Sequence, residues 1–418
     1  MNCLKSLFLS LGILIFITNC TKTDTLDDPQ TTLHDNLTGS LYIDCAGWFV
    51  RIGIKSGLIW SSDSRNLFGS NGNPMTFDTA TFYHGNLYGL TAYSSQTGIP
   101  RWSFNWPAFD DAISYREPAF KDSLLFLTSP TNFMKHATLY CINKNNGARI
   151  WEKEIDSGNV FKGFNTTPMI VDNNVIVLTR NALSQISLSS FNATDASLAW
   201  KSEINDSLSF RLRLSDKKIY STTTGQVICY DAVTGVLKWK TDLQQNHFKM
   251  TATFFEQNKI ILVREANNDY TIFTLDSVNG NVINKVTIPV PTDLPYPDYA
   301  SLGCNYRNNT FFVASRQSND TTTLRSYDLS TLSMKWEKRF ANYINTEFTP
   351  LLTDKHLVFP INDSYPNAKS KMYFLDLNGK ISSNIPFDAN YTAGFVYVVD
   401  GVIYKQENKF IYRYQSRK

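Results

Sequence analysis

Short runs in which apolar and polar residues alternate recur along the chain, and this pattern predicts β-strands rather than helices. In the clearest example, an alternating run at 227–230 leads into a turn at Thr234-Gly235 and a second short strand that ends in Trp239. The same thirteen-residue frame fits four further segments, which are 90–102, 139–151, 188–200 and 324–336. Weaker copies end at Asn284 and just after Gly379, and a copy one residue shorter ends at Trp60. The chain is therefore built from internal repeats.

Each position of this frame has a physical role. An Asp or Asn before the turn can accept hydrogen bonds from the turn backbone, and Gly supplies the positive φ that a tight turn needs. The final Trp offers a large apolar surface that can lock one repeat against the next. Where Ala196 and Leu332 replace the glycine, we expect the turn to adopt another geometry. We assign a structural, blade-docking role to Trp60, Trp102, Trp151, Trp200, Trp239 and Trp336.

Two more strand-like runs precede each copy, joined by short polar turns such as 171–174 and 353–356. Each unit is then four antiparallel strands, A to D, which is the blade of an all-β propeller. Residues 41–418 divided by eight give about 47 residues per unit, within the observed spacing of 39 to 52, whereas seven units would need 54. We predict eight four-stranded blades, with seven as the alternative. The C-terminal runs at 394–399, 402–405 and 410–414 lack a fourth strand, which the N-terminal stretch ending at Trp60 can supply to close the ring.

The N-terminus reads as a targeting signal. Lys5 precedes an apolar run at 7–18 that is too short to span a bilayer, and the run ends at Cys20. This arrangement resembles a bacterial lipoprotein signal, which implies that Cys20 carries the lipid; an ordinary secretory signal or a short uncleaved anchor are the alternatives. We expect residues 1–19 to be the signal, 20–40 a flexible Thr- and Asp-rich tether, and 41–418 the propeller.

The frame Y-D-x-x-T-G-x-x-x-W resembles the repeat of PQQ-type (quinoprotein) propellers over nearly all of 41–418. A lipidated eight-bladed ring of this length is similar to the BamB-type outer-membrane assembly lipoproteins. This narrower resemblance rests on architecture and length.

Composition and charge restrict the function. With 40 Lys+Arg against 37 Asp+Glu the chain is nearly neutral, which argues against a nucleic-acid partner. At 42% hydrophobic and 18% charged residues, the bulk of the chain is expected to fold.

No motif points to catalysis. The PQQ dehydrogenases that the resemblance brings to mind have adjacent cysteines near the quinone, whereas Cys45, Cys141, Cys229 and Cys304 are far apart in this sequence. There is no C-x-x-C-H, and the histidines are isolated, without metal-ligand spacing. We therefore predict no catalytic residues, no cofactor and no metal, and we interpret the four cysteines as buried free thiols.

The topology of a propeller suggests where a partner binds. The A–B and C–D turns lie on one face and are uniformly tight, whereas the long segments 106–116, 129–138, 289–299, 316–323 and 362–370 belong to the other face. Loops on a rigid scaffold often carry function. Our candidate partner-binding residues are Trp106, Phe109, Arg116, Phe133, Met134, Tyr296 and Tyr299.

These observations lead to one hypothesis and one rival. The hypothesis is a non-catalytic, lipid-anchored protein-binding scaffold of the bacterial envelope: a monomeric ring on the outer membrane, facing the periplasm or the outside, that touches the membrane only through its anchor. The BamB resemblance implies the β-barrel assembly machinery as the partner. The rival is a glycan- or small-ligand-binding propeller, or a propeller enzyme, that uses the central channel. Fold alone does not decide between them.

Overall fold

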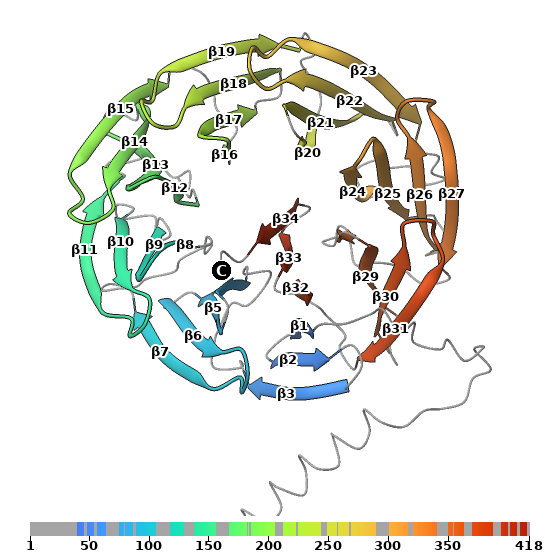
Figure 1. The fold of residues 1–418 in the computed structure, drawn as a ribbon, viewed down its shortest axis with the longest axis horizontal. Helices are drawn as coiled ribbons and strands as arrows, with labels where there is room; N and C mark the ends of the chain where they lie inside the picture. The colour runs from blue at the N-terminus through green and yellow to red at the C-terminus, as the bar shows by residue number, and fades with distance from the viewer. Residues whose placement is uncertain are drawn as a thin grey trace, which may run out of the picture.

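The computed structural model describes strands and tight turns between residues 40 and 415 (Figure 1). Residues 1–39, 64–74, 106–117, 129–137, 156–166, 205–211, 244–248, 290–300, 317–320, 341–349, 363–369, 388–393 and 416–418 lie outside the described part, with shorter gaps elsewhere. Side chains are described chiefly between residues 80 and 384.

Seven sheets each contain four antiparallel strands that follow one another in the chain. The first sheet contains β4 (Met75–Asp78), β5 (Thr81–Asn86), β6 (Gly89–Ser94) and β7 (Pro100–Asn105), and the second contains β8 (Ala119–Lys121), β9 (Leu124–Thr128), β10 (Thr138–Asn143) and β11 (Arg149–Glu154). The third sheet contains β12 (Met169–Val171), β13 (Asn174–Arg180), β14 (Ile186–Asn192) and β15 (Leu198–Ile204). The fourth sheet contains β16 (Leu212–Ser215), β17 (Lys218–Thr222), β18 (Gln226–Asp231) and β19 (Leu237–Asp242). The other three are β20 (Lys249–Glu256), β21 (Lys259–Ala266), β22 (Asp269–Asp276) and β23 (Val282–Pro289); β24 (Ser301–Arg307), β25 (Thr310–Arg316), β26 (Thr322–Asp328) and β27 (Ser333–Phe340); and β28 (Leu351–Leu352), β29 (His356–Asn362), β30 (Ser370–Asp376) and β31 (Ile381–Phe387).

The sheets stand around a common axis, with the first strand of each near the centre and the fourth on the perimeter (Figure 1). This is the β-propeller that the repeats predicted. The described part of the chain contains seven complete four-stranded sheets, and this number matches the alternative prediction of seven blades. A composite sheet fills the remaining place in the ring, so that eight sheets surround the axis, as the repeat spacing predicted.

Both ends of the propeller contribute to the composite sheet. Its strand order is β3 (Gly57–Asp63), β2 (Trp48–Gly53), β1 (Ser40–Cys45), β32 (Gly394–Val399), β33 (Val402–Glu407) and β34 (Phe410–Gln415). β1 pairs antiparallel with β32, from Ser40 opposite Val398 to Asp44 opposite Gly394. The predicted closure by both ends is confirmed. The prediction that the closing sheet has four strands is wrong, because β1 and β2 are also strands and pair along their full length.

The repeat frame has the same geometry in all eight sheets. The register between the two outermost strands of each sheet, β2 and β3 in the composite sheet, shifts at one position, as a β-bulge does. The residue just before the shift pairs with the frame's final position: Ala92 with Trp102, Cys141 with Trp151 and Cys229 with Trp239. A small residue therefore faces each of these indoles across the hairpin.

The turn between the third and fourth strands uses a left-handed residue in each described hairpin from β6–β7 to β30–β31. Gly147 and Gly235 have φ of 73° and 75°, whereas Ala196 and Leu332 both have φ of 58°. The expectation that Ala196 and Leu332 change the turn geometry is therefore wrong. The hairpin around them keeps its bulge and its Asx turn, and the side chain accepts the left-handed backbone.

The hydrophobic core lies in the joints between adjacent sheets, and each sheet contributes both of its faces. In β21, Ile260 and Leu262 pack toward the β16–β19 sheet with Tyr220 and Trp239. The alternate residues of the same strand, Ile261 and Val263, pack toward the β24–β27 sheet. This explains why the inner strands are apolar on both faces.

Gly147→Ala tests the packing at one turn. A Cβ on Gly147 would lie 2.6 Å from Cε3 of Trp102, and an L-residue at φ of 73° adds backbone strain. We expect the free energy of unfolding in urea to fall by about 2 kcal/mol. The matched control is Leu332→Ala at the same turn position, where φ is already positive and the side chain is 53% exposed. Its expected change is within about 0.5 kcal/mol. Equal losses for the two variants would contradict this explanation.

Candidate functional site

Most of the residues predicted to form a site lie outside the described part of the chain. These are Cys20, Trp106, Phe109, Arg116, Phe133, Met134, Tyr296 and Tyr299. Trp60 falls in β3, where only the backbone is described. Their roles stay predictions. We call the face that carries the A–B and C–D turns the turn face, and the opposite one the loop face.

The other five tryptophans lie in the outermost strands β7, β11, β15, β19 and β27. In three of them the indole Nε1 donates to a backbone carbonyl in the C–D turn of the next sheet. The donor–acceptor pairs, at 3.0, 3.1 and 3.0 Å, are Trp102–Lys144, Trp151–Ala193 and Trp336–Leu377. Each acceptor directly follows the Asn or Asp that starts its turn. These tryptophans thus join neighbouring sheets at the rim of the turn face.

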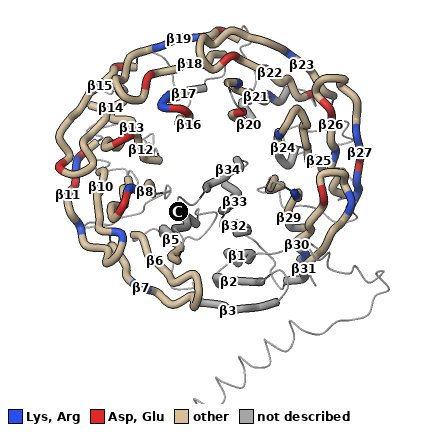
Figure 2. The backbone as a smooth tube through the Cα atoms, viewed as in Figure 1, with Lys and Arg blue, Asp and Glu red and all other residues tan. Residues whose placement is uncertain are grey.

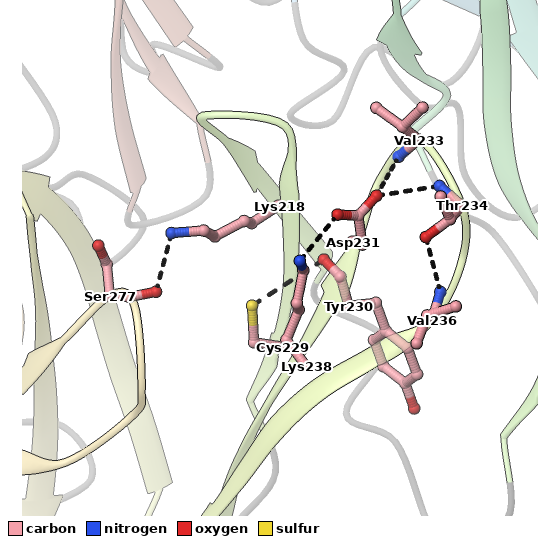
Figure 3. Close-up of polar contacts among 9 residues, drawn as sticks. All are labelled: Lys218, Cys229, Tyr230, Asp231, Val233, Thr234, Val236, Lys238 and Ser277. Carbon is pink, nitrogen blue, oxygen red and sulfur yellow. Dashed lines mark hydrogen bonds and ion pairs between the residues drawn. The ribbon is translucent and has the colours of Figure 1, made fainter.

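Trp239 packs against the turn of the next sheet like the other tryptophans, but its indole N–H makes no equivalent hydrogen bond. Its Nε1 is buried and has no hydrogen-bond partner among the described residues. The equivalent carbonyl, that of Ser277, already accepts from Lys218 Nζ at 3.1 Å and from the Tyr220 hydroxyl at 3.4 Å. Figure 3 shows Lys218 reaching Ser277 from the neighbouring sheet.

The joint between the β20–β23 and β24–β27 sheets lacks a tryptophan. Asn284 stands at the frame's final position in β23 and is exposed. In the next turn, Leu332 takes the place that Gly147, Gly235, Gly280 and Gly379 hold beneath an indole elsewhere. Leucine at the turn position therefore accompanies the absence of a tryptophan at this joint, whereas the smaller Ala196 holds the same position at a joint where Trp151 keeps its hydrogen bond.

In the turn between β18 and β19, a carboxylate organises the backbone (Figure 3). Asp231 Oδ1 accepts from the N–H groups of Val233 and Thr234 at 2.9 and 3.0 Å, and Oδ2 pairs with Lys238 Nζ at 3.1 Å. Burial raises the pKa of Asp231, but these N–H donors and the ammonium outweigh it and hold the pKa below its ordinary value. The carboxylate is therefore ionised at neutral pH and holds the turn.

A second set of contacts links the A–B turns on the inner part of the turn face. Asp172 binds Lys217 of the next sheet at 2.8 Å, and the Asp172 carbonyl accepts from Lys121 Nζ of the preceding sheet at 2.9 Å. Three successive sheets are thus connected through one residue.

Similar contacts link the A–B turns of the β20–β23, β24–β27 and β28–β31 sheets. Glu256 accepts from the Tyr306 hydroxyl at 2.6 Å and from Asn308 N–H at 3.0 Å, and Arg307 donates to the Thr353 carbonyl at 2.8 Å. Burial and the hydrogen bond to Glu256 raise the pKa of Tyr306, so the phenol stays protonated and can donate. Contacts between neighbouring sheets therefore occupy the turn face both near the central axis and at the perimeter.

Two arginines are buried within the ring. Arg264 is 0% exposed and lies over the Phe273 ring, with its charged carbon 5.5 Å from the ring centroid. Burial lowers the pKa of Arg264, and the Asp242 carboxylate opposes that shift. Arg325 pairs with Glu337 at 2.9 Å and donates to Ser315 at 2.8 Å. We interpret both as joint or sheet contacts rather than as catalytic groups.

Cys141, Cys229 and Cys304 are buried and form no disulfide, which confirms the interpretation of these three as buried thiols. Burial raises the pKa of Cys141 to about 12 and that of Cys229 to about 11, so both stay neutral thiols at neutral pH. Within the described ranges, no group of three or more His, Cys, Asp and Glu is suited to hold a metal ion. The same part of the chain contains no helix long and apolar enough to cross a membrane.

One loop-face tip is described, and sequence reasoning missed it. Leu183, between β13 and β14, is 79% exposed. Asn181 fixes this loop, since its Oδ1 accepts from the N–H groups of Leu183 and Gln185, both at 3.0 Å. An exposed leucine on a hydrogen-bonded tip is a candidate contact for an apolar partner surface. The sequence signal is a single large apolar residue, next to Ala182, in the short run 181–185 between two strands.

These features define a β-propeller of PQQ-like repeats, as the frame predicted. A family model described as outer membrane protein assembly factor BamB matches residues 88–218 and 187–283, just under half of the chain. The matched range runs from β6 in the first four-stranded sheet to the start of β23 in the fifth. No curated protein matches the chain.

Several solved structures are similar to the chain. The designed Ika8 protein has a TM-score of 0.53 at 13% identity, over 84% of this chain and 98% of its own. A europium-containing methanol dehydrogenase has a TM-score of 0.50 at 12% identity, over 76% and 78%. BamB from Moraxella catarrhalis aligns over 94% and 98% at 12% identity, with a TM-score of 0.40. Likeness at such identities concerns the fold alone. Because one of these proteins is a dehydrogenase, fold does not separate a scaffold from an enzyme.

Replacing Trp102 and Trp239 by Phe separates packing from hydrogen bonding. Both changes remove similar apolar area, but only Trp102→Phe removes a hydrogen bond, the one to the Lys144 carbonyl. We expect Trp102→Phe to lower the free energy of unfolding by about 1 kcal/mol more than Trp239→Phe does. Urea unfolding followed by tyrosine-sensitive circular dichroism measures both. A larger loss for Trp239→Phe would contradict the assignment of the two joints.

Proposed function

We propose that the protein is a non-catalytic, lipid-anchored scaffold of the bacterial envelope that binds protein partners through its loop face. The observation that carries this proposal is the match of residues 88–283 to the family model described as outer membrane protein assembly factor BamB. By that likeness, the partner is a component or a client of outer-membrane protein assembly.

The geometry supports the choice of face. The described turn-face hairpins hold the ring together through Trp102, Asp172, Glu256 and their partners. The longest connections belong to the loop face, and its described tip presents Leu183 in a fixed conformation. A rigid ring that displays variable loops is a common arrangement for recognition.

The anchor follows from the sequence. Lipid on Cys20 places the ring at the outer membrane, and the tether 20–40 gives it reach. The ring acts as a monomer. The catalytic rival would instead need a site in the channel.

In-cell crosslinking with affinity capture and mass spectrometry tests the proposal. The native chain should recover barrel-assembly components. Altering 106–116 or 289–299, or introducing Leu183→Ser, should reduce that recovery several-fold, because each change removes part of the loop-face surface. The matched control is Leu198→Ser, which changes a leucine that is 55% exposed on the outer strand β15. Each variant should keep the thermal transition of the parent chain.

Other outcomes would reject the proposal. Recovery of glycan-uptake or surface proteins in place of assembly components would move the function to the glycan-binding alternative. Loss of capture only from turn-face substitutions would contradict the choice of face.

A further inference from the structure

Asn-Gly pairs recur in the C–D turns of the ring. The asparagines of these pairs are Asn146, Asn279 and Asn378, and all three are exposed, whereas the pair at Asn71 lies outside the described part of the chain. An asparagine before glycine is chemically labile, because glycine has no side chain to keep its backbone nitrogen away from the asparagine amide. The three turns hold this amide in two different ways.

The glycine that follows each asparagine is held in nearly the same way in all three turns. Gly147, Gly280 and Gly379 have φ of 73°, 77° and 82°, and each lies beneath an indole. Their N–H groups donate to the carbonyl of the Asn or Asp that starts the turn, at 2.8, 2.9 and 3.0 Å. The exposure of the asparagine and the conformation of the glycine therefore do not distinguish the three sites.

The asparagine side chain does distinguish them. Asn146 Oδ1 accepts from the backbone N–H two residues further on at 3.0 Å, and Asn279 Oδ1 accepts from the equivalent N–H at 2.9 Å. In the turn between β30 and β31 the equivalent N–H is that of Lys380, and it donates to Asp376 Oδ1 at 2.9 Å instead. The cause is length, since this turn is one residue shorter than the other two. The bond that restrains the other two amides is therefore taken from Asn378.

We propose that Asn378 is a site of spontaneous deamidation in the folded protein, whereas Asn146 and Asn279 are protected by their turns. The Gly379 backbone nitrogen gives up its proton and bonds to Cγ of Asn378. The bond from Cγ to the amide nitrogen breaks, and this nitrogen takes up a proton and leaves as ammonia. Solvent water then opens the succinimide ring to aspartate or isoaspartate. At the two protected sites the hydrogen bond to Oδ1 has to break before the same step, which slows it.

The modified residue falls at a joint of the ring. Trp336 of β27 donates from Nε1 to the Leu377 carbonyl at 3.0 Å and lies over Gly379, where a Cβ would be 2.7 Å from its Cδ2. Figure 2 shows the turn between β30 and β31 beside β27. An isoaspartyl linkage inserts a methylene into the backbone between the carbonyl and the glycine that Trp336 contacts, and so loosens this joint. The inference goes beyond the proposed function and does not depend on it.

The test is ageing of the native full chain in mildly alkaline buffer, and it needs no variant. Peptide mapping with mass spectrometry measures Asn, Asp and isoaspartate at each site, and the rate at each site is divided by its rate in a sample unfolded in guanidinium. We expect this ratio to be several-fold higher at Asn378 than at Asn146 or Asn279, because unfolding removes the turns that protect the latter two. Equal ratios at the three sites, or a higher ratio at Asn279, would overturn the proposal.

Two variants link the modification to the joint. Asn378→Gln removes the reactive amide, since glutamine would have to close a larger ring, and the aged variant should keep the thermal transition of the fresh one. The matched control is Asn279→Gln, which should lose transition temperature on ageing as the parent chain does. The transitions of the fresh variants verify folding. An equal fall in both aged variants would contradict the assignment of the loosened joint to Asn378.

Discussion

The contact on which the ring depends is that of an indole in one outermost strand with the left-handed turn of the next sheet. Hydrogen bonds within the backbone hold each sheet together, whereas the contacts between adjacent sheets in the described part of the chain are made by side chains. Trp102 shows the complete contact: its ring lies over Gly147 and its Nε1 donates to the Lys144 carbonyl. The glycine provides the space, and the fixed Asx turn presents the carbonyl. The complete unit recurs at Trp336 and Gly379, and the joints of Trp151, Trp200 and Trp239 keep part of it.

Much of the fold could be predicted because the repeat frame is local. Alternation, the Asp or Asn before the turn and the Trp after it lie within thirteen residues, and their physics acts over that distance. The composite sheet was predicted only in part, because the pairing of Ser40–Cys45 with Gly394–Val399 spans the whole chain. The turns at Ala196 and Leu332 were misjudged because the surrounding hairpin outweighs the preference of one residue for negative φ.

The candidate site was less accessible from the sequence. The link from Lys121 through Asp172 to Lys217 joins turns far apart in the chain, and no motif announces it. Leu183 stands out only when its exposure is known. In the described part of the chain, these contacts show that the turn face holds the ring together. Recognition by the loop face is our proposal.

A double-mutant cycle at the joint without a tryptophan tests this account most directly. The changes are Asn284→Trp in β23 and Leu332→Gly in the following turn, measured as free energies of unfolding in urea singly and together. The account predicts that Asn284→Trp alone gives no gain, because Leu332 occupies the place of the ring. The pair should be stabilised relative to the sum of the single changes by about 1 kcal/mol, since it creates the contact seen at Trp102 and Gly147. Additive single effects would contradict the claim that the indole and the bare turn act as one unit.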